Sequence, residues 1–147
     1  MDVPAFPLET QGRETLFTTG SSLRAIVHIV DDDESVRRSL CRFLEAYGFA
    51  VRCYGTGNAF LADMQTPRYG CLVLDFQMPG LDGLETLARA YSGGWTLPVI
   101  IISASQDPFL ETQVRRAGAW AFLRKPIDPE ILLSTVDKAA RGHSKVP

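Results

Sequence analysis

Short, mainly apolar runs alternate with amphipathic segments along most of the chain. The apolar runs fall at residues 25–30, 50–54, 70–75, 97–103 and 120–125. Runs of this length with little polar interruption are typical of strands that are buried on both faces of a parallel sheet. The segments between and after them, in which apolar residues recur at helical spacing, are residues 34–48, 58–64, 83–91, 107–118 and 128–141. The pattern therefore predicts five strands that alternate with five helices.

This alternation predicts the fold class and its boundaries. Strands that alternate with helices form an open parallel sheet with helices on both faces, here an α/β fold of the flavodoxin-like type with five strands in the order 2-1-3-4-5. Residues 24–142 are expected to form this single domain. Residues 1–23 are rich in Thr, Ser, Gly and Pro and predict a flexible arm, and residues 143–147 a short tail.

Three of the expected helices carry recognisable start signals. Asn58 is a candidate N-cap for the second helix. Asp107-Pro108 and Asp128-Pro129 each place a capping carboxylate before a proline, which is favoured at the first helical position. These signals predict helix starts at the corresponding positions.

Composition excludes several classes of protein. The chain has 147 residues, of which 46% are hydrophobic, so it can build a substantial core. With 15 basic against 17 acidic side chains it has no excess positive charge for gripping nucleic acid. Neither a membrane-spanning run nor a secretory signal is apparent. The three cysteines, Cys41, Cys53 and Cys71, have no metal-binding spacing and are expected to be buried, reduced thiols of a cytoplasmic protein.

Polar residues that could bind a ligand or take part in a reaction lie where the predicted strands end. Asp31 and Asp32 end the first strand, Asp75 the third, Ser103 the fourth and Lys125 the fifth. In this fold the carboxyl ends of the strands border the functional crevice. Three carboxylates are therefore expected to meet one hydroxyl and one amine at the same edge of the sheet.

This set of groups favours Mg²⁺ binding and phosphoryl transfer. Crowded carboxylates repel one another, and a hard cation such as Mg²⁺, which prefers oxygen ligands, offsets that repulsion. A carboxylate can also act as a nucleophile and form an aspartyl phosphate. An ammonium and a hydroxyl can then stabilise the phosphoryl oxygens.

Four motifs in this order resemble the receiver domain of two-component response regulators, in particular its FixJ branch. They are "VDDDES", "LVLDFQMPGLDG", "IIISAS" and "GAWAFLRKP", and the resemblance extends over residues 25–141. It implies that Asp75 is the phosphoacceptor. It also implies that Asp31 and Asp32 hold Mg²⁺ together with Asp75 and the backbone carbonyl of Gln77.

The resemblance also implies how a signal would leave the site. Ser103 would be the switch hydroxyl, Phe122 the switch aromatic and Lys125 the phosphoryl-contacting amine, with a cis peptide bond before Pro126. When Ser103 moves toward the phosphoryl group, Phe122 is expected to turn inward and fill the vacated space. The surface expected to change carries Phe109, Arg115, Arg116, Trp120 and Arg124.

Partners and tuning residues follow from the same resemblance. The expected phosphodonor is a sensor histidine kinase or a phosphotransfer protein, and the output is dimerisation or binding of a separate output protein, without direct contact to nucleic acid or membrane. Gln77 and Ser105, two residues beyond Asp75 and Ser103, are expected to tune the lifetime of the phosphoryl group. The domain is not expected to be an enzyme beyond its own phosphorylation and dephosphorylation. The chain ends at Pro147 with no room for an output domain, so it is either a stand-alone receiver or one excised from a longer protein.

Two other functions fit parts of the sequence. "IVDDDES" also resembles the start of haloacid-dehalogenase-type phosphatases, in which the first Asp is the nucleophile, but Ser35 stands where that family has Thr or Val. A pseudo-receiver that binds proteins without phosphorylation is the second alternative. Three further residues have structural interpretations: Asp33 and Asp82 as helix-start acids and His28 as a packed core histidine.

Overall fold

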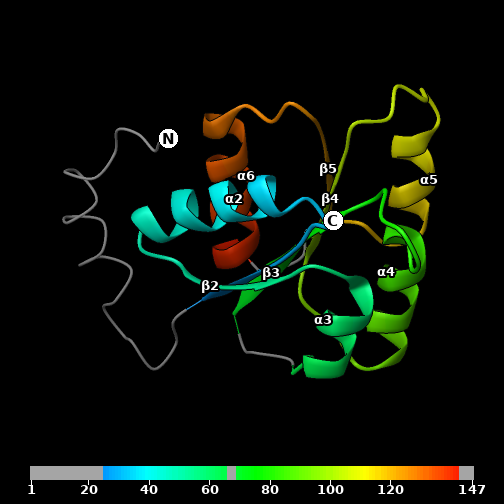
Figure 1. The fold of residues 1–147 in the computed structure, drawn as a ribbon, viewed down its shortest axis with the longest axis horizontal. Coiled ribbons are helices and arrows are strands. Elements are labelled where there is room, and N and C mark those ends of the chain that lie inside the picture. Colours follow the sequence, from blue (N-terminus) through cyan, green and yellow to red (C-terminus); the bar gives the residue numbers. More distant parts are fainter. Residues whose placement is uncertain (1–24, 66–68, 143–147) are drawn as a thin grey trace.

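The computed structural model describes residues 25–65 and 69–142, and it shows one parallel sheet with helices on both sides (Figure 1). The strands are β1 (Ile26–Val30), β2 (Ala50–Tyr54), β3 (Gly70–Asp75), β4 (Val99–Ser103) and β5 (Ala121–Arg124). The helices are α2 (Glu34–Ala46), α3 (Gly57–Asp63), α4 (Gly83–Ser92), α5 (Leu110–Arg116) and α6 (Pro129–Gly142). The predicted arm and tail lie outside the described residues.

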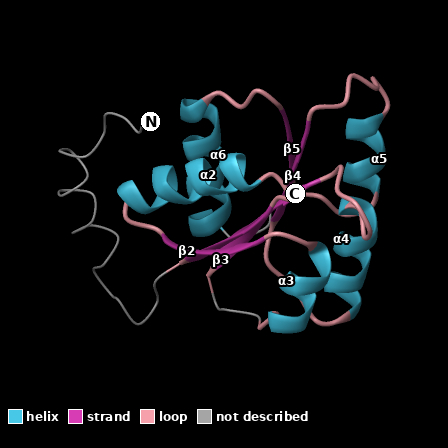
Figure 2. Ribbon diagram, viewed as in Figure 1, coloured by secondary structure: helices cyan, strands magenta, loops and turns pink. Residues whose placement is uncertain are grey.

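The strand order is β2-β1-β3-β4-β5, which confirms the predicted fold class. All four pairings are parallel. The strands run through the middle of the molecule, with α2 and α6 on one side and α3, α4 and α5 on the other (Figure 2). Strand β3 has neighbours on both sides and every one of its residues is buried, as the continuous apolar run predicts.

Two hydrophobic cores fill the two faces of the sheet. On the α2–α6 side, helices α2 and α6 pack Leu44 and Val136 against β-strand residues such as Ile100. On the α3–α5 side, helices α3, α4 and α5 pack against the opposite face, with Phe60 and Trp95 among the largest fully buried side chains. Figure 1 shows the same division, with α2 and α6 together and α3, α4 and α5 on the other side. The alternation of side chains along each strand sends neighbouring residues into different cores.

The helix starts differ from the prediction in two places. Helix α3 is capped by the hydroxyl of Thr56, which accepts from the amide of Ala59, so Asn58 lies inside the helix. Helix α5 begins at Leu110 because the carboxylate of Asp107 accepts from the amide of Phe109 in a local turn. Asp128 caps α6 as predicted. Within the described ranges, no helix has both the length and the apolar content needed to cross a membrane.

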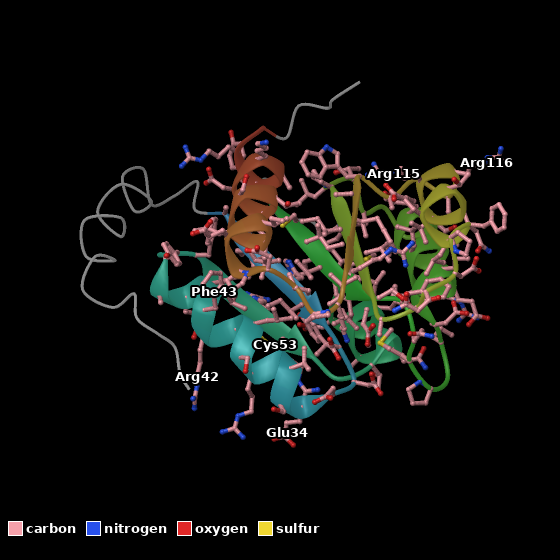
Figure 3. The ribbon with its side chains drawn as sticks, turned by 90° about the horizontal axis from the view of Figure 1, so that it is seen from above. Glu34, Arg42, Phe43, Cys53, Arg115 and Arg116 are labelled. Atoms are coloured by element: carbon pink, nitrogen blue, oxygen red, sulfur yellow. A yellow bond between two sulfur atoms is a disulfide. The ribbon has the colours of Figure 1, made fainter. Side chains whose placement is uncertain are left out.

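The cysteines correct the prediction of three reduced, buried thiols. Cys41 on α2 and Cys53 on the edge strand β2 form a disulfide, and Cys53 is exposed. Figure 3 shows Cys53 beside helix α2, near Phe43. Only Cys71, in the centre of the sheet, is the buried free thiol that was expected. The two partners are twelve residues apart in sequence, and only the packing of α2 on β2 brings them together.

Candidate phosphoacceptor site

Three carboxylates meet at the carboxyl ends of β1 and β3. One oxygen from each of Asp31, Asp32 and Asp75 lies within 4.8 Å of the others. Asp31 is fully buried and Asp75 is 3% exposed, whereas Asp32 is exposed to solvent. The structure thus brings together the three acidic residues that the strand ends predicted. Buried oxygen ligands with one open side fit Mg²⁺, which keeps several waters when bound to carboxylates.

Lys125 supplies the positive charge of the site. Its Nζ lies 3.2 Å from Oδ2 of Asp31 and 3.6 Å from Oδ1 of Asp75. Its backbone amide donates to the carbonyl of Ser103 at 2.8 Å, which fastens the end of β5 to the end of β4. The peptide bond to Pro126 is cis. One ammonium between two buried carboxylates leaves the cluster with excess negative charge, which a bound cation would neutralise.

The environment of Asp75 differs from that of an ordinary surface carboxyl. Burial raises the pKa of Asp75 to about 7, and the negative charge of Asp31 adds to the rise. The Lys125 ammonium and a hydrogen bond from the Gln77 backbone amide lower the pKa, but by less. A carboxyl with a raised pKa in a pocket that also holds a charge partner is a common feature of functional sites. A cation bound beside it would favour its ionised, nucleophilic form.

The loop after β1 orients Asp31 and separates it from its acidic neighbours. The amide of Asp33 donates to Oδ1 of Asp31 at 2.9 Å. The carboxylate of Asp33 turns away and caps α2 by accepting from the amides of Ser35 and Val36. This confirms the interpretation of Asp33 as a helix-start residue. Of the four consecutive acidic residues, Asp31 and Asp32 therefore belong to the acidic cluster, whereas Asp33 and Glu34 belong to the start of α2.

Helix α4 begins directly against the end of strand β3. A Cβ atom at Gly83 would lie 2.7 Å from Cα of Phe76 and 2.9 Å from the carbonyl oxygen of Asp75, so only glycine fits there. The Gly83 amide donates to the carbonyl of Phe76 at 2.8 Å. Asp82 and Glu85 complete a reciprocal capping box, as the sequence predicted for Asp82. The loop that carries Gln77 is therefore held at both ends.

Ser103 and Phe122 lie on the β4–β5 side of the site. Ser103 is fully buried, and its Oγ accepts from the amide of Ser105 at 3.0 Å. Phe122 is 9% exposed and belongs to the core on the α3–α5 side. The ring is buried in this structure, and its movement on phosphorylation stays a prediction. Ser103 precedes the exposed Ala104, so the chain leaves the sheet immediately after the hydroxyl.

Comparison with known proteins agrees with this geometry. The sequence model of the response regulator receiver domain matches residues 27–137, which is most of the chain. The chain belongs to the response regulator receiver family. Receiver domains act in two-component signalling and are signalling domains rather than classical enzymes. The phosphatase interpretation of "IVDDDES" is thereby set aside.

Individual relatives cover the receiver domain and extend beyond it. The transcriptional regulatory protein FixJ of Rhizobium meliloti is 36% identical over 114 residues, which are 78% of this chain and 56% of that protein. The response regulator TodT of Pseudomonas putida F1 is 31% identical over 121 residues, which are 82% of this chain and 53% of that protein. The chain thus spans about half the length of the curated relatives it matches.

Solved structures show the same fold. The crystal structure of FixJ-N superposes with a TM-score of 0.74 at 34% identity, covering 84% of this chain and 97% of that one. The response regulator StyR gives a TM-score of 0.75 at 32% identity and covers 82% of this chain and 61% of that one. Both likenesses agree with the sheet order described above.

Two arginines of this receiver domain support the site without having been predicted to do so. Arg37 on α2 donates to the backbone carbonyl of Asp31 at 2.7 Å. Arg124 on β5 donates to carbonyl groups of the loop that follows Ser103. Arg124 lies within "GAWAFLRKP" and was expected on the output surface, but the carbonyl groups that the two arginines bind are distant in sequence, so one sequence gives no signal of these contacts. Of the two predicted tuning residues, Gln77 is exposed and Ser105 is half-buried.

Proposed function

We propose that this receiver domain is a phosphorylatable switch in which Asp75 accepts a phosphoryl group from a sensor histidine kinase or a phosphotransfer protein. The observation that carries the proposal is the position of Asp75, buried beside Asp31 and contacted by Lys125 at the edge of the sheet. Transfer breaks the phosphorus–nitrogen bond of a phosphohistidine and forms a phosphorus–oxygen bond to Asp75. Hydrolysis later returns the carboxylate and inorganic phosphate. Such a partner places the domain in the cytoplasm.

Mg²⁺ is the cofactor we propose for this reaction. Asp31, Asp32 and Asp75 would hold it through carboxylate oxygens, and the backbone carbonyl of Gln77 would add a further ligand. When bound, Mg²⁺ neutralises the carboxylates and the phosphoryl oxygens. Among the described residues, Lys125 is the one ammonium close to the acidic cluster, so the cluster can accommodate a divalent cation.

The remaining groups would stabilise the phosphoryl group in place. Lys125 lies within ion-pair distance of Asp75 and can contact a phosphoryl oxygen. Ser103 accepts a hydrogen bond through its Oγ and so keeps its own hydroxyl proton for donation to a second oxygen. Gln77 and Ser105, which flank the opening, would orient or block the water that hydrolyses the aspartyl phosphate.

The output we propose is altered dimerisation or partner binding through the face formed by α5, β5 and α6. Phe109 is 75% exposed at the start of α5, an unusual exposure for an aromatic ring. Arg115 and Arg116 lie at the other end of that helix, where Figure 3 shows them at the margin of the molecule. Aromatic and arginine side chains are enriched in protein interfaces. We propose no direct DNA contact for this domain.

Intact-mass analysis with acetyl phosphate and Mg²⁺ tests the proposed function. We expect the wild-type protein to gain one acid-stable, base-labile phosphoryl group and Asp75→Asn to gain none. Asp33→Asn is the matched control, because asparagine also caps helices and Asp33 faces the helix rather than the pocket. Asp32→Asn should weaken Mg²⁺ binding in calorimetry. Equal labelling of wild type and Asp75→Asn would refute the assignment, and a wild-type protein that is never labelled would favour the pseudo-receiver.

A further inference from the structure

Arg124 connects three features of the β4–β5 side. Its Nη1 donates to the backbone carbonyl of Ser105, and its Nη2 donates to the carbonyl of Asp107 at 3.3 Å. Its Cζ lies 5.0 Å from the centre of the Phe122 ring, a cation–π arrangement. A single guanidinium thus joins the loop after β4 to the buried aromatic ring on β5.

The strand register explains why Arg124 reaches this loop. Arg124 pairs with Ser103 across the β4–β5 ladder, and Phe122 pairs with Ile101. Residues two apart on a strand point to the same face, so Phe122 and Arg124 share a face with Ser103. The planar, five-donor guanidinium can hold two carbonyl groups of one loop while its flat side covers a ring.

The loop that Arg124 holds also fixes the Ser103 hydroxyl. The amide of Ser105 donates to Oγ of Ser103, and the amide of Asp107 donates to Oγ of Ser105. Helix α5, which follows, has no side-chain hydrogen bond at its N-cap, Phe109. The position of the Ser103 hydroxyl therefore depends on the loop, and Arg124 ties the loop to strand β5.

We propose that Arg124 is a positioning residue for the phosphoryl group on Asp75, which rests on the function proposed above. It holds residues 104–109 and the Phe122 ring in the arrangement in which the Ser103 hydroxyl is available to a phosphoryl oxygen. Without Arg124 the loop samples other positions, and only a fraction of molecules is ready to bind. The apparent affinity for a phosphoryl group falls by that fraction.

Beryllofluoride, a mimic of a phosphoryl group on a carboxylate, provides the test when it is titrated in the presence of Mg²⁺. The proteins are wild type, Arg124→Gln, Arg124→Lys and Arg42→Gln, which removes the same charge from an exposed position on α2, outside the proposed output face. We expect Arg124→Gln to weaken beryllofluoride binding about fivefold, the size of effect that two exposed hydrogen bonds and one cation–π contact allow. Mg²⁺ binding without beryllofluoride should be unchanged, because Arg124 does not contact the acidic cluster.

The lysine variant separates position from charge. Arg124→Lys keeps the charge but lacks the planar guanidinium that binds two carbonyl groups at once. It should therefore recover less than half of the beryllofluoride affinity lost in Arg124→Gln, on a logarithmic scale. In a Phe122→Leu background the effect of Arg124→Gln should shrink, because part of it acts through the ring. Arg42→Gln should match wild type.

Each contrary result has a distinct meaning. Arg124→Gln binding like wild type, or Arg124→Lys binding like wild type, would overturn the positioning role. Equal loss of Mg²⁺ and beryllofluoride affinity would overturn it too, because a general structural defect then explains both. A wild-type protein that does not bind beryllofluoride would overturn the proposed function and this inference with it.

Discussion

The two sides of the sheet are built differently. On the α2–α6 side the helices have 13 and 14 residues, and each begins with a carboxylate that accepts two backbone amides. On the α3–α5 side, α3 and α5 have 7 residues each, and α5 has no side-chain cap. The two buried side-chain nitrogens without a hydrogen-bond partner among the described residues, in His28 and Trp95, also lie on the α3–α5 side.

This difference indicates that the two sides of the sheet differ in how easily their helices move. Helix α4 has 10 residues and a capping box, but short helices such as α3 and α5, of which α5 has no side-chain cap, depend on packing for their stability and shift at low cost. The α3–α5 side also contains Phe122 and the loop held by Arg124, which follows Ser103 directly. We infer that helix α2 and the sheet face it covers are the fixed frame of the domain and that the α3–α5 side responds to phosphorylation, so the proposed α5–β5–α6 face changes through α5 and β5.

A matched pair of core truncations should show the largest effect. Leu44→Ala on α2 should lower the free energy of unfolding by about 4 kcal/mol, because the leucine is fully buried between a long helix and the sheet. Leu110→Ala on α5, where the leucine is 2% exposed, should cost only about 2 kcal/mol, since a short helix can move to fill the cavity. Urea unfolding followed by circular dichroism measures both. Equal costs would remove the energetic basis for distinguishing the sides.

Reduction of the disulfide should have the next largest effect. Cys41 and Cys53 close a loop of 12 residues between α2 and β2, and opening it should lower the free energy of unfolding by about 3 kcal/mol through the entropy of the unfolded chain. The measurement compares urea unfolding of the wild type with and without reductant. Cys41→Ser/Cys53→Ser is the control and should not respond to reductant, although Cys71 remains. A reductant-insensitive wild type would show that the bond contributes nothing to the frame.

Acid should lower the free energy of unfolding through His28, which lies on the α3–α5 side. Burial lowers the pKa of His28 to about 4, so between about pH 4 and about pH 6.5 the unfolded chain binds the proton and the folded chain does not. This contribution to stability is complete above about pH 6.5 and is lost as the pH falls toward about 4, with about 2 kcal/mol gone by about pH 5. The slope of unfolding free energy against pH should be shallower in His28→Gln. Parallel slopes for the two proteins would rule out this source of acid sensitivity.

The strands, their order and the acidic cluster could be predicted from the sequence because they depend on local patterns of residue types. Apolar runs gave the strands, the alternation gave the sheet order, and the strand ends placed Asp31, Asp75 and Lys125 together. These features depend on the residue types themselves and on rules of parallel sheets that admit few exceptions.

The responsive side was predicted less well because its details depend on contacts across the fold. Asp107 next to proline favours a helix start, but its carboxylate bonds the amide of Phe109 and the helix begins later. The burial of Phe122, and the hydrogen bonds from Arg124 to the loop after β4, depend on the β4–β5 register. One feature of the frame was missed for the same reason, because the Cys41–Cys53 disulfide depends on how α2 packs against β2.

Backbone amide shifts on titration with beryllofluoride and Mg²⁺ test the division between frame and responsive side most directly. We predict that shifts begin around Asp75 and continue through residues 104–109, along α5 and into β5. Helix α2 beyond its first turn should keep its spectrum, apart from the residues next to Asp31. Shifts confined to the residues around Asp75, or shifts of equal size along α2 and α5, would contradict the account.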